Sequence, residues 1–364
     1  MRTTDKLEIV DKEEKMTRRI KQTTLLLTAI FVMFCASVTV HAARTMTQNA
    51  GGTTKNAVAV NWQNVAQTLK AEYSSYKEVN VTSITLKWGT SSSAMTGSVV
   101  LAPNTTSYVI SGLQPATSYR AELYWTGSYV SSGGYSYDRK DVYVEGTSIY
   151  TAPGMITSLG DYDYMKNQKG FEMIWYVPAG GNAGRGVEYQ IVSTSGKILA
   201  SGTETVYMQP GAQKLFSLTS FSGYKQVARI HLRGYSTLLD GSTKVYGEWS
   251  AWKNLVPQPI VNTNTKKYGI NTKNWTMKLA FSRVAGAKSY TIKISTKAKS
   301  GYKKVATVKQ KSKKTIKYTV NKYKGAKFKS QKHYYVQIIT NAGSYGKSRG
   351  AYYTDFYTRR YFKY

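Results

Sequence analysis

The segment LQPATSYRAELYW, from Leu113 to Trp125, decides the fold because it leads from a turn directly into a long strand pattern. Pro115 marks the turn, and from Tyr119 onward apolar side chains occupy every second position up to Trp125. Alternation of this kind predicts a β-strand with one buried face, and a Pro-containing turn is a typical boundary of such a strand.

Two landmarks of this type recur along the chain. Alternating apolar runs that end in an aromatic residue recur after 113 and 106 residues, at Trp62, Trp175 and Phe281. Turn-like segments that end in tyrosine recur after 105 and 110 residues, at Tyr119, Tyr224 and Tyr334. Short alternating runs separated by Gly, Ser, Asn and Pro fill the intervals. A period of this length with about seven strands is typical of one immunoglobulin-like β-sandwich per repeat.

The repeats resemble fibronectin type III domains. That family carries a Trp on its second strand and a Leu-x-Pro-x-Thr-x-Tyr corner leading into its sixth strand; in the third repeat Phe281 replaces the Trp, and the corner lacks Pro and Thr. The match is strongest in the first repeat, and its residues in all three repeats are Trp62, Leu113, Pro115, Tyr119, Trp175, Tyr224, Phe281 and Tyr334. The resemblance implies an all-β fold of three tandem sandwiches, in which each corner tyrosine hydroxyl bonds back to the preceding turn. It names no ligand, because this fold carries many unrelated functions.

The predicted organisation has five parts. We expect a signal peptide at 1–42, a flexible lead-in at 43–56 that also offers a first strand, and fibronectin type III-like domains at 57–152, 153–258 and 259–364. The Pro-containing segments TAPG, Thr151–Gly154, and VPQP, Val256–Pro259, fit short joints between domains.

The N-terminus has the pattern of an export signal. A Lys- and Arg-rich start leads into the apolar run Leu25–Val40, and Val40 and Ala42 occupy the small-residue positions before a cleavage site. The alternative is an uncleaved anchor, but this run is shorter than the roughly 20 residues of a membrane-spanning helix. Cleavage would remove Cys35, the single cysteine, so the mature chain would fold without disulfides or a membrane span. These features predict a secreted or surface-retained protein, and they favour a bacterial source.

Charge is concentrated in the last repeat. The chain has 51 Lys and Arg against 19 Asp and Glu, a formal net charge of +32, and the segment from Ile260 to the end holds 26 basic residues and one acid, Asp355. Because antiparallel strands alternate in direction, two loops of this repeat should emerge at one pole. They carry nine lysines, at Lys297, Lys299, Lys303, Lys304, Lys322, Lys324, Lys327, Lys329 and Lys332. A second group should lie at the opposite pole, at Lys309, Lys311, Lys313 and Lys314.

This concentration of charge predicts binding of an anionic polymer, with the lysines acting as mobile point charges. The expected partners are anionic cell-wall polymers or acidic glycans. The alternative is that the lysines form a solvated surface with no ligand. Specific nucleic-acid binding is not expected, because the chain lacks an Arg-rich segment. The first two domains could also bind a protein partner.

Catalysis is not expected. Three histidines and one cysteine leave little material for metal clusters or nucleophile systems, and we predict no catalytic residues, metal or cofactor. Asp161 and Asp163 lack the rest of a calcium loop, and GGNAGRG, Gly180–Gly186, lacks the end of a phosphate-binding loop. The sequence therefore predicts a non-catalytic binding or adhesion protein. The alternatives are a structural spacer or assembly subunit, and an accessory protein to an extracellular enzyme.

Overall fold

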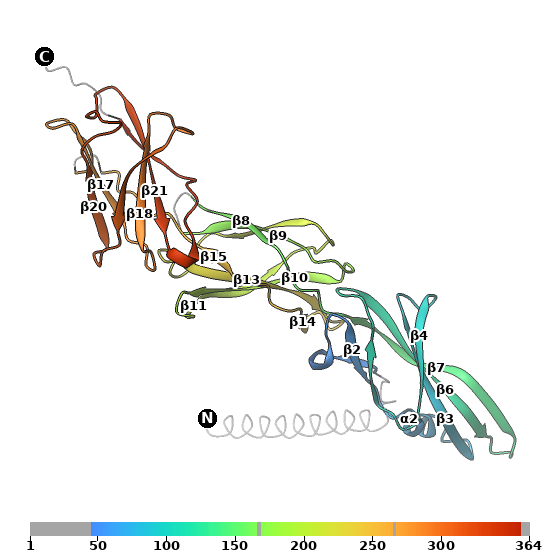
Figure 1. Ribbon diagram of the computed structural model, residues 1–364. Helices are drawn as coiled ribbons and strands as arrows, with labels where there is room; N and C mark the ends of the chain where they lie inside the picture. The colour runs from blue at the N-terminus through green and yellow to red at the C-terminus, as the bar shows by residue number, and fades with distance from the viewer. Residues whose placement is uncertain (1–44, 166–168, 265–266, 358–364) are drawn as a thin grey trace, which may run out of the picture.

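The computed structural model describes residues 45–165, 169–264 and 267–357, and this part of the chain is mostly β-strand. Three β-sandwiches follow one another in an elongated row, from the blue N-terminal one to the red C-terminal one (Figure 1). The predicted all-β class with three tandem sandwiches is confirmed. The predicted signal peptide, 1–42, lies outside the described residues. Within those described ranges, no helix has the length and apolar character that crossing a membrane requires.

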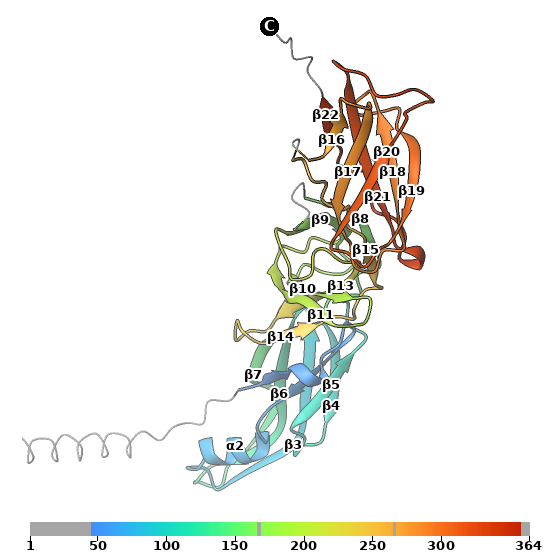
Figure 2. The same ribbon diagram turned by 90° about the vertical axis from the view of Figure 1, so that its left-hand side faces the viewer.

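The first sandwich packs a three-stranded sheet, in the order β1-β2-β5, against a four-stranded sheet, in the order β4-β3-β6-β7. Helix α2 (Val65–Glu72) lies between β2 and β3, at the end of this sandwich far from the second one (Figure 2). A 3-10 helix, η1 (Ala50–Gly52), follows the first strand. The strands are β1 (Thr47–Asn49), β2 (Ala57–Asn61), β3 (Glu78–Gly89), β4 (Met95–Leu101), β5 (Ser107–Ser111), β6 (Ser118–Val130) and β7 (Ser136–Tyr150).

The second sandwich repeats this arrangement with sheets β12-β9-β8 and β11-β10-β13-β14. Its last strand is split, because β14 and β15 pair with successive parts of β13. The strands are β8 (Leu159–Tyr164), β9 (Phe171–Tyr176), β10 (Gly184–Ser193), β11 (Ile198–Thr205), β12 (Gln213–Leu218), β13 (Ala228–Thr237), β14 (Lys244–Tyr246) and β15 (Lys253–Leu255).

The third sandwich has sheets β16-β17-β20 and β19-β18-β21-β22. In all three sandwiches the first, second and fifth strands therefore form one sheet, and the remaining strands form the other. A 3-10 helix, η2 (Gly343–Tyr345), follows β21. The strands are β16 (Gly269–Asn271), β17 (Thr276–Ser282), β18 (Ser289–Ser295), β19 (Lys303–Lys309), β20 (Thr315–Val320), β21 (His333–Asn341) and β22 (Thr354–Tyr357).

The aromatic landmarks lie in the sandwich cores. Trp62 directly follows β2, whereas Trp175 and Phe281 lie on β9 and β17, and all three side chains are buried. Along β17 Met277, Leu279 and Phe281 are buried and Lys278 between the first two is exposed, while the small Ala280 is also buried. The period of two thus places one face of each such strand in the core.

The predicted tyrosine corner forms in two of the three sandwiches. The backbone N–H of Gln114 donates to the Tyr119 hydroxyl at 2.9 Å, and that of Lys329 donates to the Tyr334 hydroxyl at 3.1 Å. Tyr224 packs against the core of the second sandwich and is only partly buried, and its hydroxyl makes no corner bond in the described chain. The turn before β13 forms a joint with the third sandwich, as described below.

The segment 43–56 is not a flexible lead-in over its described part. The side chain of Met46 is buried in the core of the first sandwich, and its backbone N–H donates to Glu145 Oε2 at 2.6 Å. Strand β1 pairs with β2 in antiparallel register. The segment therefore contributes an edge strand and part of the core. The first strand that the sequence offered for this segment is β1.

Backbone hydrogen bonds join the first sandwich to the second. The N–H groups of Gly181 and Ala183 donate to the carbonyl oxygens of Pro115 and Ala116 at 2.8 and 2.7 Å. The glycine-rich segment singled out in the sequence thus forms this joint. A Cβ atom at Gly181 would lie 2.7 Å from the Ala116 oxygen, so glycine permits the close approach of these two segments of the chain.

The second joint uses the equivalent loops. The N–H of Val227 donates to the Ala285 carbonyl and the N–H of Ala285 donates to the Lys225 carbonyl, both at 2.9 Å. Val227 and Val256, from the second sandwich and its exit, pack in the core of the third sandwich. In both joints the turn before the sixth strand of one sandwich therefore binds the loop after the second strand of the next.

Candidate functional site

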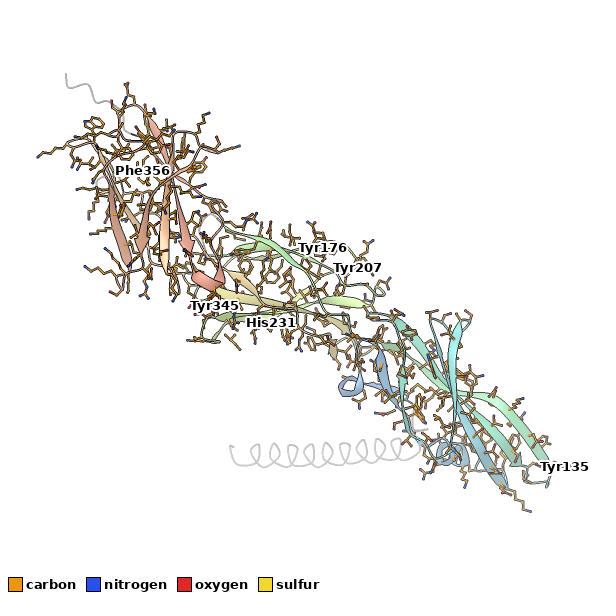
Figure 3. All side chains as sticks on the ribbon, in the orientation of Figure 1. Tyr135, Tyr176, Tyr207, His231, Tyr345 and Phe356 are labelled. Carbon is orange, nitrogen blue, oxygen red and sulfur yellow. The ribbon has the colours of Figure 1, made fainter. Side chains whose placement is uncertain are left out.

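The structure brings the nine predicted lysines to one end of the third sandwich. The second joint contacts the loop after β17, so the β18–β19 loop (296–302) and the β20–β21 loop (321–332) lie at the opposite, free end. Figure 3 shows Tyr345 near the second sandwich, Phe356 further along the row, and nitrogen-tipped side chains around the far end. We call this group the lysine pole, and all nine of its members are exposed: Lys297, Lys299, Lys303, Lys304, Lys322, Lys324, Lys327, Lys329 and Lys332.

The second lysine group lies at the joint end. The β19–β20 turn is held there by two backbone bonds, from Gln310 N–H to the Lys288 carbonyl at 3.0 Å and from Arg283 N–H to the Lys314 carbonyl at 2.9 Å. The exposed lysines of this group are Lys309, Lys311, Lys313 and Lys314. They are therefore separated from the lysine pole by the length of the sandwich.

Aromatic anchors hold the β20–β21 loop. Tyr323 and Phe328 are buried, and each packs edge-on against Tyr334, with ring centroids 6.0 and 4.9 Å apart. Between them, a tight turn places Lys324 and Gly325 at positive φ, 52° and 78°, the geometry of a type I′ turn. The alternation of buried rings and exposed lysines projects the charges outward from a fixed loop.

Local hydrogen bonds close the β18–β19 loop. The Ser295 hydroxyl donates to the Ser300 carbonyl at 2.6 Å, and the Tyr302 hydroxyl donates to the Ala298 carbonyl at 2.7 Å. Burial, together with nearby Tyr353, raises the pKa of Tyr302 to about 12, so its hydroxyl stays protonated as a donor. The lysines of this loop are thus also presented from an ordered backbone.

The lysine pole has no carboxylate partner among the described residues. The one acid of the third repeat, Asp355, lies with its Oδ2 atom 2.8 Å from His333 Nδ1. Like charges gathered in this way raise the positive potential at one end of the molecule. An anionic chain passing over this end could pair with several ammonium groups at once.

The other sequence candidates have structural roles. Asp161 and Asp163 form ion pairs with Arg349, at 3.3 and 3.5 Å, across the second joint. His231 and His333 lie on different sandwiches, as expected from their separation. Across the described ranges, no three His, Cys, Asp or Glu side chains gather as a metal site.

His231 lies in a closed stack of rings on the second sandwich. Its ring is parallel to those of Trp249 and Trp252, with centroids 3.9 and 3.6 Å away. Arg233 covers Trp249 at 4.5 Å and Arg229 covers Trp252 at 5.0 Å. Burial, aided by the neighbouring arginines, lowers the pKa of His231 to about 4, so the ring is neutral at pH 7.

Sequence reasoning missed a group of aromatic side chains beside the lysine pole. The residues His333, Tyr335, Tyr353 and Tyr357 contact one another across β21, β22 and the segment before β22. The segments HYYV and YYTDFY contain them, but only the pairing of the two strands shows that they share one face.

No family model and no curated protein matches this chain. Among solved structures it is similar to a two-domain fibronectin type III segment of chicken tenascin, at 13% identity, covering 58% of this chain and 97% of that one with a TM-score of 0.27. It is also similar to the FN1–FN3 domains of chicken CNTN1, at 13% identity, covering 85% of this chain and 96% of that one with a TM-score of 0.22. The fold class rests on the common strand order of the three sandwiches.

Proposed function

We propose that this protein is a non-catalytic attachment protein that binds an anionic polymer through the lysine pole. The observation that carries the proposal is the position of nine exposed lysines, without carboxylate partners in the described chain, at the free end of a row of sandwiches. An extended polyanion would relieve the mutual repulsion of these cations. Anionic cell-wall polymers and acidic glycans of a cell surface are the expected ligands.

The first two sandwiches act as a spacer in this proposal. Backbone bonds fix both joints, and the second joint shares two core residues with the third sandwich. Such joints resist bending, because motion at them would break hydrogen bonds and expose apolar side chains. The lysine pole is thereby held at a distance from the other end of the chain. The protein would be exported and retained on a surface by its charge.

The test asks whether binding depends on where the lysines lie on the third sandwich or only on its total charge. In the chain from residue 43 onward, glutamine replaces five lysines of the β20–β21 loop: Lys322, Lys324, Lys327, Lys329 and Lys332. A control variant has glutamine at five exposed lysines elsewhere on the same sandwich: Lys309, Lys311, Lys313, Lys314 and Lys317. Both variants lose the same net charge.

We expect the pole variant to bind soluble polygalacturonate or inorganic polyphosphate at least about tenfold more weakly at about 0.1 M salt, since several ion contacts are lost. The control variant should lose less than about threefold, because long-range attraction is screened over about 10 Å. Equal losses in the two variants would show that only total charge matters. Failure of the parent chain to bind either polymer would refute the proposal.

A further inference from the structure

One face of the third sandwich presents aromatic side chains next to the lysine pole. In the sheet β19-β18-β21-β22, Tyr335 is opposite Ser295 on one side and Asp355 on the other, and His333 is opposite Tyr357. Side chains directly opposite each other point to the same face of a sheet. Because Tyr334 and Val336 point into the core, Tyr335 and its partners point outward. We call His333, Tyr335, Tyr353 and Tyr357 the aromatic strip.

The rings of the strip form a continuous surface. The His333 ring stacks on Tyr357 with centroids 4.3 Å apart and lies nearly parallel to Tyr335 at 5.9 Å. Tyr353 meets Tyr335 edge-on at 5.3 Å. Tyr353 and Tyr357 nevertheless keep 42% and 43% of their surface exposed. The strip is therefore ordered by its own contacts and still offers ring surface to a ligand.

In the closed stack of the second sandwich the ring faces are covered by other side chains, although Trp252 keeps 39% of its surface exposed. There Trp249 and Trp252 have His231 on one face and an arginine on the other. No comparable cation contact covers the rings of the aromatic strip within the described residues. The two surfaces occupy equivalent sheets of neighbouring sandwiches, so the difference lies in their side chains.

Charge and hydrogen-bonding groups surround the strip. Lys293 pairs with Lys304 on the neighbouring strands of the same sheet face, which continues the positive surface. Asp355 lies within the strip, with its Oδ2 atom 2.8 Å from His333 Nδ1. A groove of about 380 Å³ adjoins the strip, with Tyr353 and Asp355 among its lining residues. This volume is within the usual range of ligand pockets.

We infer that the aromatic strip binds sugar rings, so that the polymer held by the lysine pole is an acidic polysaccharide. This inference rests on the proposed function. The C–H faces of a pyranose ring are apolar and pack well on exposed tyrosine rings, while the phenol hydroxyls remain available for hydrogen bonds. Asp355 can accept hydrogen bonds from sugar hydroxyls.

The position of Asp355 also separates this ligand from other polyanions. Asp355 repels any anionic group, but a sugar unit also presents hydroxyl groups that can donate hydrogen bonds to this carboxylate, whereas a fully ionised polyphosphate has none. A polyphosphate has no ring to stack on the strip. Single-stranded nucleic acid has stackable bases, and it is therefore the competing ligand that the test must include.

The test uses the chain from residue 43 onward with Tyr353→Ala and Tyr357→Ala combined. Two controls accompany it: the Tyr353→Phe and Tyr357→Phe pair, which keeps both rings, and Tyr135→Ala, which removes an exposed ring from the first sandwich. The probes are polygalacturonate, inorganic polyphosphate and oligothymidylate of similar charge number. Thermal unfolding of each variant verifies that the third sandwich is folded.

We expect the double alanine variant to bind polygalacturonate about threefold to tenfold more weakly for each ring removed, with polyphosphate binding unchanged. The phenylalanine pair and Tyr135→Ala should bind both polymers nearly as the parent does. Equal loss for both polymers, or no loss for polygalacturonate, would overturn the inference while leaving the proposed function intact. Preferred, strip-dependent binding of oligothymidylate would also overturn it. Binding of none of the probes by the parent would refute the proposed function itself.

Discussion

The second and third sandwiches have the same strand order and differ in what their ends and faces do. The second is joined at both ends, and residues 153–258 hold ten Lys and Arg against seven Asp and Glu. The third has one joined end and, in the described structure, one free end, and residues 260–364 contribute +25 of the chain's net charge of +32. With the same strand order, the turn before the sixth strand therefore forms a joint in one sandwich and an exposed charged loop in the other.

The difference shows why cations accumulate at only one place. A turn that binds the next sandwich brings its backbone within hydrogen-bonding distance of another chain segment, as Lys225 and Val227 do with Ala285. Desolvating several lysines at such a contact would be costly. The corresponding turn of the third sandwich has no such neighbour in the described structure and carries five lysines around two buried aromatic anchors.

The largest effect is expected from a substitution at a joint between two sandwiches, compared with a matched substitution in a loop that joins nothing. In Gly181→Ala the new Cβ would lie 2.6 Å from Thr117 Oγ1 and 2.7 Å from the Ala116 oxygen, so the first joint should be destabilised by about 1 to 3 kcal/mol. Small-angle X-ray scattering should then show a less extended or more variable chain.

The matched change at the free end is Gly325→Ala. No atom lies within 4 Å of a Cβ there, and only the positive φ of 78° opposes the substitution. We expect a cost of about 1 kcal/mol and no change in the scattering profile. A change of shape in Gly325→Ala, or none in Gly181→Ala, would contradict the contrast between joined and free ends.

A smaller effect is expected for the pH dependence of stability that arises from His231 in the closed stack. The folded pKa of His231 is about 4, below the usual value of an unfolded histidine, about 6.5. Between these values the unfolded chain binds a proton that the folded chain does not, so stability decreases as the pH falls through this window. We expect a loss of roughly 1 to 2 kcal/mol in the unfolding free energy of the second sandwich by pH 4.5.

Urea unfolding of the parent and His231→Gln at pH 7 and pH 4.5 measures this loss. The variant should lack the part of the pH dependence that arises from His231, so the difference between the two proteins should shrink at the lower pH. A parent and variant with identical pH dependence would show that the stack does not hold His231 neutral.

The smallest expected effect concerns the tyrosine corners. Tyr334→Phe and Tyr119→Phe remove an acceptor from the backbone N–H groups of Lys329 and Gln114, and each should lower the unfolding free energy by about 1 kcal/mol. Tyr224→Phe should change it by less than about 0.5 kcal/mol, since this hydroxyl makes no corner bond in the described chain. A cost at Tyr224 as large as that at Tyr334 would contradict the assignment.

The sequence predicted the features that depend on local pattern. Alternation and the spacing of Trp62, Trp175 and Phe281 gave three sandwiches, and strand direction gave the lysine pole. Spacing also predicted a corner at Tyr224, where the described structure has no corner bond, because the position of a tyrosine before a strand does not by itself determine the path of its turn. The burial of Met46 and the aromatic strip were missed because the hydrogen bond of the Met46 N–H to Glu145 and the pairing of His333 with Tyr357 join segments far apart in the chain.

The salt dependence of polymer binding tests the central claim most directly. Polygalacturonate affinity would be measured between 50 and 200 mM salt for the parent, the variant with five glutamines in the β20–β21 loop, and the control with five glutamines at Lys309, Lys311, Lys313, Lys314 and Lys317. Each lost ion contact should flatten the slope of log affinity against log salt by roughly 0.7. The account predicts a slope flatter by about 3 for the pole variant and nearly unchanged for the control. Identical slopes for the two variants would contradict it.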